Sequence, residues 1–188
     1  MQTMNSVKRM TLSAVCIALC VVLPIAFHSI PDAGTVFLPM HIPVLICGMI
    51  CGWPYGLLCG LLGPLTSSVL TGMPPVAFLP AMMVECGTYG LVSGLVLKYI
   101  RTRNTYVDLY AALIIAMLAG RVVSGIAKAL IFTPGLAMSA WITASFVTAL
   151  PGILIQLLFL PSVVLTLMKA KVIPLRYRNG KVTADFHN

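Results

Sequence analysis

The strongest constraint on this chain is a series of long apolar segments. Short stretches rich in proline, glycine or charged residues separate these segments. An α-helix needs about 20 mainly apolar residues to cross a lipid bilayer. Charged residues make up only 9% of the 188 residues, whereas a soluble domain averages about 25%, so most of the surface must face lipid. The pattern predicts an all-α integral membrane protein, a compact bundle of six transmembrane helices. The expected helices cover residues 7–27, 41–51, 55–70, 76–100, 107–132 and 143–168.

The basic residues predict how this bundle is oriented. Ten of the twelve Lys and Arg residues lie at the start of the first expected helix, at the junction of the fourth and fifth, or after the sixth. The loops at 28–40, 71–75 and 133–142 contain none. Because loops rich in Lys and Arg stay in the cytoplasm, we expect both termini there. The expected organisation is a cytoplasmic N-terminus at 1–6, a transmembrane domain at 7–168 and a basic cytoplasmic tail at 169–188.

The net charge of +8 does not indicate nucleic-acid binding. The basic residues are distributed between the apolar segments, whereas a nucleic-acid-binding protein gathers them on one face. We expect the lipid bilayer to be a partner and nucleic acid not to be one.

Small residues recur at every fourth position in several of the segments. This spacing lets two helix backbones approach closely, and in lipid such packing takes the place of the hydrophobic effect. The sequence therefore predicts a tightly packed bundle. The pairs are Gly48 and Gly52, Gly56 and Gly60, and Gly90 and Gly94, and a longer series comprises Ala116, Gly120 and Ser124.

The first expected helix has a further pair of small residues, Ala14 and Ala18, with Ser13 beside it. These residues either pack within the bundle or form a docking face for another membrane protein. The spacing fits both interpretations.

The chain has no phosphate-binding loop of the form G-x-x-x-x-G-K-[ST], because Val182 follows its only Gly-Lys pair, Gly180-Lys181. The chain therefore does not hydrolyse ATP by that route. If it drives uphill transport, the energy comes from a partner or from an ion gradient.

Several motifs together resemble a known family. The chain is similar to the substrate-binding S components of energy-coupling factor (ECF) vitamin transporters over residues 10 to 168. Six expected spans and a size near 190 residues fit the same family. The motifs are Ala14-x-x-x-Ala18, Leu38-Pro39-Met40-His41-Ile42-Pro43-Val44-Leu45, Gly52-Trp53-Pro54-Tyr55-Gly56-x-x-x-Gly60, Pro80-Ala81-Met82-Met83-Val84-Glu85, and Gly120-Arg121.

This resemblance implies a function and a set of partners. It implies that residues 7–168 bind a small water-soluble vitamin or vitamin precursor from outside, in a bacterial cell membrane. It implies a transmembrane coupling protein and two cytoplasmic ATPases as partners, with Ala14 and Ala18 in contact with the coupling protein. It also implies that the outer loops close over the ligand.

Glu85, Arg121 and Lys128 lie well within the expected spans, away from their ends. An intramembrane charge costs at least about 2.5–3.5 kcal/mol on insertion scales, so it normally faces the bundle interior and has a function. Counting at 1.5 Å per residue places Glu85 and Arg121 at similar depth, with Tyr89 one turn from Glu85 and Lys128 nearer the outside. We expect these four residues to contact the ligand. The alternative is a structural Glu85–Arg121 salt bridge, with Lys128 extending to the interface.

Three further candidates for ligand contact lie near the outer ends of the helices, His41, Phe37 and Trp141. The aromatic rings either stack on a flat ligand or belong to the interfacial belt of the membrane, and His41 either contacts the ligand or caps its helix.

No metal, cofactor or catalytic residue is expected. Met40-His41 is similar to the start of nickel and cobalt S components, but here it is internal and residue 2 is Gln2. The six cysteines lie in apolar segments, where a thiol usually packs as a small hydrophobic group.

Two other functions compete with substrate binding. An ion-coupled exporter would use Glu85 as its central carboxylate. An intramembrane hydrolase would use Ser67 or Ser68 with a histidine, but neither His28 nor His41 has a clear carboxylate to orient it.

Overall fold

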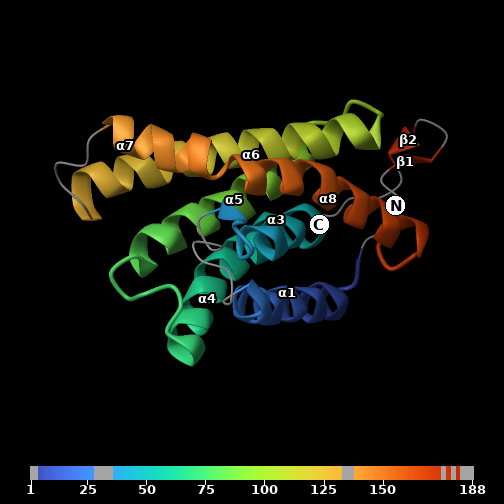
Figure 1. Ribbon diagram of the computed structural model, residues 1–188. Helices are drawn as coiled ribbons and strands as arrows, with labels where there is room; N and C mark the ends of the chain where they lie inside the picture. The colour runs from blue at the N-terminus through green and yellow to red at the C-terminus, as the bar shows by residue number, and fades with distance from the viewer. Residues whose placement is uncertain (1–3, 28–35, 133–137, 175–176, 179–180, 183–188) are drawn as a thin grey trace.

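The computed structural model describes residues 4–27, 36–132, 138–174, 177–178 and 181–182, and almost all of them are helical (Figure 1). The α-helices are α1 (Ser6–Phe27), α3 (His41–Cys51), α4 (Trp53–Thr71), α5 (Leu79–Tyr99), α6 (Thr105–Ala127), α7 (Met138–Ile142) and α8 (Leu150–Lys169). Two π-helical segments, η1 (Lys128–Phe132) and η2 (Thr143–Thr148), follow α6 and α7. Residues 28–35 and 133–137, which belong to two of the predicted loops, lie outside the described part.

Among the described residues, four helices are long and apolar enough to cross a membrane, by length and composition: α1, α5, α6 together with η1, and α8. Helix α3 is apolar but has only 11 residues. The protein is therefore an all-α integral membrane protein. The side of the membrane on which its termini lie stays a prediction.

Helix α3 occupies the middle of the bundle. It contacts α1, α4, α5, α6 and α8, and in Figure 1 it lies between α1 and α4 on one side and α6 and α8 on the other. Nearly every residue from His41 to Cys51 is buried, as expected for a helix that is hydrophobic on all sides. It ends at Cys51, as the sequence predicts. The next residue, Gly52, has a φ of 95°, which glycine adopts easily and which turns the chain directly into α4.

Glycines hold α4 against α5. A Cβ added to Gly90 would overlap the backbone of Gly56, and one added to Gly60 would overlap the carbonyl group of Cys86. Likewise, a Cβ on Gly94 would overlap the backbone of Trp53. The two backbones are therefore in direct contact over several turns, which confirms the tight packing that the small-residue spacing predicts.

The same device brings α6 close to α5. Gly120 of α6 lies against the ring of Tyr89, and an added Cβ would overlap that ring. Ala116 and Ser124, one turn to either side of Gly120, are also buried. This small-residue face explains how the large, fully buried Tyr89 side chain fits between the two helices.

The last predicted span is not one continuous helix, which corrects the expectation for residues 143–168. The chain forms α7, then the π-helical segment η2, and only then α8 from Leu150. Pro151 lies in the first turn of α8. Proline lacks an N–H and its ring clashes with the carbonyl group of the preceding turn, so Pro151 disfavours a regular α-helical connection from η2 into α8.

The tail contains a small element that the sequence analysis does not predict. Strands β1 (Tyr177–Arg178) and β2 (Lys181–Val182) pair in antiparallel fashion, with Tyr177 opposite Val182. The remaining tail residues from 183 onward are outside the described part.

We expect Gly90→Ala to lower the free energy of unfolding by about 1–3 kcal/mol, the usual cost of overpacking, because its Cβ would meet the backbone of Gly56. Gly87→Ala on the same helix is the matched control. Its Cβ would lie 3.3 Å from the end of the flexible Leu61 side chain, so the change should be nearly neutral. Unfolding of the purified protein in mixed micelles would measure both. Equal effects would contradict the direct backbone contact.

Candidate functional site

A polar cluster lies between α5 and α6, with the carboxylate of Glu85 at its centre. The hydroxyl of Tyr89, one turn further along α5, donates to Glu85 Oε1 at 2.9 Å. From α6, the hydroxyl of Ser124 donates to Glu85 Oε2 at 3.1 Å, and the Lys128 ammonium lies 3.7 Å from the same oxygen. Because residues one turn apart share a helix face, each helix presents two polar residues to the other.

The alternative prediction of a Glu85–Arg121 salt bridge is wrong, because Glu85 pairs with a different residue. The ion pair is with Lys128, and the side chains of Lys128 and Glu85 are 32% and 12% exposed. Ser124 lies level with Glu85, so the lysine one turn beyond it reaches the carboxylate. Lys128 therefore does not extend freely to the interface. It is also the first residue of the π-helical segment η1, and π-helical turns occur frequently at functional sites.

Arg121 points to the other side of α6, toward η2. Its Nη1 donates to the backbone carbonyl of Ser145, and its guanidinium lies 5.7 Å from the centroid of the Phe146 ring. The residue is only 4% exposed. Its Nε and Nη2 have no hydrogen-bond partner among the described residues. No ion pair joins Arg121 to Glu85 in the described part of the chain.

Trp141 packs beside Arg121 on the same side of α6. Its ring lies against Gly125, where an added Cβ would overlap it, and it meets the Phe146 ring edge to face at 6.0 Å. The indole Nε1 is buried, and no residue in the described part of the chain accepts its hydrogen bond. Phe146 thus connects Trp141 to Arg121.

His41 reaches the cluster from the N-terminus of α3. It is 2% exposed, and its ring meets the Tyr89 ring edge to face at 4.9 Å. Within the residues that the structure describes, neither ring nitrogen has a hydrogen-bond partner. The structure therefore places His41 against Tyr89, the residue that donates to Glu85.

The contacts of Phe37 in the described part of the chain are with other residues than those of the polar cluster. Its ring packs on Phe27 of α1 at 5.8 Å, and its backbone lies against Gly152 of α8. These contacts attach the segment before α3 to α1 and α8.

The sequence analysis missed three contributors to the site. Ser124 was assigned to helix packing, although it also lies one turn before Lys128. Ser145 and Phe146 contact Arg121 only because η2 folds back onto α6, and no residue pattern indicates that contact.

Residues 8–164 of the chain match the family described as the substrate-specific component of ECF transporters. The chain belongs to this family. It is therefore the substrate-specific component of a membrane transporter, a type of subunit that associates with a membrane protein and ATPases. No curated protein and no solved structure matches the chain.

The two alanines of this S component lie on the outer surface of α1. Ala14 and Ala18 are exposed, as a docking face requires. The expectation that Ser13 belongs to this docking face is corrected, because Ser13 is buried. Its hydroxyl donates to the Arg9 carbonyl at 2.8 Å and lies 3.5 Å from the thiol of Cys47 on α3. Ser13 packs inside the bundle because it is one residue, and hence about 100° around the helix, from Ala14.

Other polar residues of the S component do not assemble into a metal site or a serine–histidine pair within the described part. No group of three or more metal-ligating side chains occurs there, and the six cysteines are buried and free. Ser67 Oγ is buried without a hydrogen-bond partner among these residues, and Ser68 Oγ donates to the Pro74 carbonyl at 2.8 Å.

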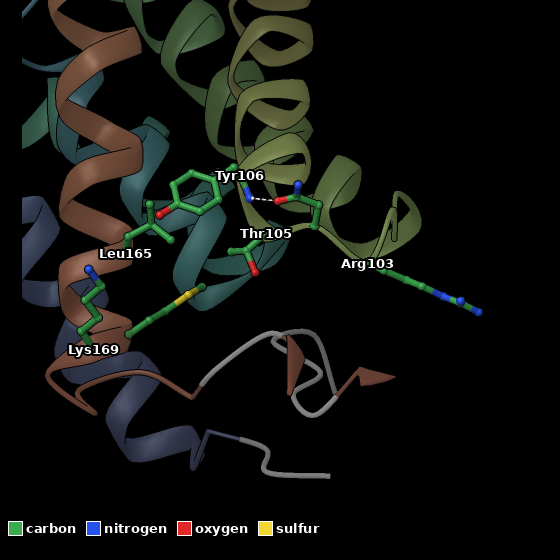
Figure 2. Close-up of a pocket in the computed structure, with 7 residues that line it drawn as sticks. Arg103, Thr105, Tyr106, Leu165 and Lys169 are labelled. Atoms are coloured by element: carbon green, nitrogen blue, oxygen red, sulfur yellow. Dashed lines mark hydrogen bonds between the residues drawn. The ribbon is translucent and has the colours of Figure 1, made fainter. Parts of the chain in front are cut away.

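A separate pocket of about 340 Å³ lies at the other end of α6, between the start of α6 and the end of α8 (Figure 2). It is distinct from the polar cluster, since α6 begins at Thr105 and Lys128 follows its last residue. Its lining residues are Arg103, Asn104, Thr105, Tyr106, Leu165, Met168 and Lys169.

We expect Tyr89→Phe to destabilise the S component by about 1.5–3 kcal/mol, the range for a hydrogen bond to a charged group. The change removes the donor to Glu85 and keeps the ring against Gly120 and His41. Tyr55→Phe is the control, since its half-buried hydroxyl makes no hydrogen bond in the described part. Unfolding in detergent would measure both, and an unchanged Tyr89→Phe stability would mean that the hydroxyl does not support the carboxylate.

Proposed function

We propose that this S component binds a small water-soluble vitamin or vitamin precursor that has a carboxylate or phosphate group. The ligand contacts Arg121, Trp141 and His41 beside the Glu85–Lys128 pair. A transmembrane coupling protein and two cytoplasmic ATPases then drive uptake across a bacterial cell membrane.

The observation that supports this ligand class is that Arg121 is buried with hydrogen-bond donors left unused among the described residues. The guanidinium is 4% exposed, and two of its three nitrogens lack a partner in the described part of the chain. A buried donor without a partner costs about 1–3 kcal/mol, and more when it is charged. A carboxylate or phosphate accepts two parallel hydrogen bonds from such a guanidinium, so an anionic ligand satisfies the side chain.

The neighbouring groups favour the same ligand class. Glu85 already accepts hydrogen bonds from Tyr89 and Ser124 and pairs with Lys128, so its charge is compensated within the protein. The remaining hydrogen-bonding capacity belongs to nitrogens of Arg121, Trp141 and His41. Two aromatic rings, Trp141 and Phe146, lie beside the guanidinium and provide flat surfaces for a ring on the ligand.

The energy source follows from the family and the sequence together. The chain has no phosphate-binding loop for ATP, and S components associate with a module that contains ATPases. Both observations support the proposal that partners drive transport by ATP hydrolysis, and they favour it over the ion-coupled exporter centred on Glu85.

We expect Arg121→Ala to weaken ligand binding by about 2–5 kcal/mol, the range for truncating one member of a buried charge pair, or roughly thirty-fold to several thousand-fold in Kd. Arg121→Lys should also weaken binding, because an ammonium cannot reproduce the two parallel bonds of a guanidinium. The ligand would first be identified by mass spectrometry of the compound that co-purifies with the wild type, and affinities measured by calorimetry.

Arg9→Lys is the matched control for that experiment, since Arg9 is the other buried arginine in the described part of the chain and belongs to α1. It should bind the ligand with wild-type affinity. Thermal unfolding of each variant separates binding from folding. Wild-type affinity in Arg121→Lys, with normal stability, would remove Arg121 from the binding site.

The docking role of Ala14 and Ala18 rests on their position. Both lie on the exposed, apolar face of α1, which also carries Met10, Val22 and Ile25 at 62%, 56% and 53% exposure. Small residues one turn apart on such a face let a partner helix approach closely.

We expect Ala14→Trp or Ala18→Trp to abolish uptake in cells and to leave ligand binding by the purified protein within about twofold, because a bulky ring keeps the partner helix away. Leu158→Trp, at a position of α8 that is 71% exposed, is the control and should transport normally. Normal uptake by both alanine variants would exclude this face as the docking surface.

A further inference from the structure

The pocket at the start of α6 lies at the basic end of the bundle. The N-terminus of α1, the C-terminus of α5, the start of α6 and the end of α8 all lie at this end (Figure 1). The described residues here include seven basic side chains and one carboxylate, that of Asp108, which is fully buried. The basic residues are Lys8, Arg9, Lys98, Arg101, Arg103, Lys169 and Lys171.

The Asp108 carboxylate is already engaged within the protein. Its Oδ1 accepts hydrogen bonds from the Thr102 hydroxyl at 2.6 Å and from the Thr102 N–H at 3.0 Å. Within the described part, no carboxylate pairs with Arg103 or Lys169. Among the described residues, no carboxylate therefore compensates the charges of these two pocket residues.

Two pocket residues converge on the space between α6 and α8. In Figure 2, the Tyr106 hydroxyl lies beside Leu165, and the Lys169 ammonium extends toward the same part of α8 from below. Arg103 extends outward from the rim. The lining of the pocket thus provides an exposed ammonium group, that of Lys169, and a hydroxyl donor, that of Tyr106, with Arg103 directed away from them.

The wall of the pocket continues into an apolar surface along α6. Tyr106, Tyr110 and Ile114 follow one another at four-residue spacing on one helix face, and they are 55%, 38% and 46% exposed. On α8, Leu165 and Met168 contribute apolar side chains to the pocket. A molecule with an anionic head and an apolar chain fits this arrangement better than a free anion.

We propose that the pocket between α6 and α8 binds the headgroup of an anionic phospholipid, with the phosphate near Lys169 and an acyl chain along Tyr110 and Ile114. Basic pockets between helices at a membrane surface bind anionic headgroups in this way, and each Lys or Arg near such a surface contributes about 1 kcal/mol, or roughly fivefold in affinity. This lipid site is separate from the proposed ligand site, at the opposite end of α6.

The test uses the full-length protein in detergent, titrated with dioctanoyl phosphatidylglycerol and with dioctanoyl phosphatidylcholine. Binding would be followed by native mass spectrometry and by the rise in melting temperature. We expect phosphatidylglycerol to bind at least tenfold more tightly. Lys169→Gln should weaken that binding roughly fivefold, Arg103→Gln should weaken it less, and Lys169→Arg should retain it. Because Lys169 and Arg103 are exposed, these changes should leave the lipid-free melting temperature unchanged.

Lys8→Gln is the matched control, since Lys8 is an exposed basic residue at the same end that does not line the pocket. It should bind phosphatidylglycerol like the wild type. Glycerol 1-phosphate, which has the headgroup phosphate without acyl chains, should bind at least tenfold more weakly. Equal binding of the two lipids, equal losses in Lys8→Gln and Lys169→Gln, or tight binding of glycerol 1-phosphate would each overturn the proposal.

Discussion

Direct contact between helix backbones is the constraint on which the rest of this structure depends. In lipid, helices gain nothing from burying apolar surface against one another, so close van der Waals packing must hold them together. Gly56, Gly60 and Gly90 provide that packing between α4 and α5. The short helix α3 is enclosed as a result, and His41 at its first position is buried. The close contact of Gly120 with Tyr89 then places α6 against α5, which sets the distance across which Glu85, Ser124 and Lys128 meet.

The charged residues inside the bundle fall into two groups, which differ in whether the protein itself compensates their charge. Glu85 and Lys128 compensate each other, and two hydroxyls support the carboxylate. Arg121 instead rests on the backbone of η2 and the ring of Phe146, with nitrogens that no described residue engages. A protein that needed Arg121 only for folding would gain more by pairing it with Glu85, because an uncompensated buried charge is costly. The π-helical segments η1 and η2 flank this region, and such segments are common where function requires irregular backbone.

Helix α6 connects two regions of opposite character. One end carries Lys128 and faces the polar cluster, and the other begins beside the basic pocket with Lys169. In the proposed arrangement, the first region recognises the transported molecule and the second holds the protein at the membrane surface. The docking face with Ala14 and Ala18 belongs to α1 and involves neither region. The proposed sites for recognition, membrane contact and coupling are therefore on separate surfaces, so we expect a change in one to leave the others intact.

The sequence by itself determined the membrane class, the family, the bounds of α3 and the small residues at the helix contacts, because apolar length, charge and four-residue spacing are local properties. It also indicated which charged residues lie inside the membrane, since depth along a helix follows from counting residues. Only the tertiary structure decided that Lys128 rather than Arg121 pairs with Glu85, that Ser13 faces inward, and that η2 brings Phe146 to Arg121. These outcomes depend on how far each helix is rotated about its own axis and on where Pro151 interrupts the last span. Rotation is set by the packing of neighbouring helices, which the residue pattern of a single helix does not contain.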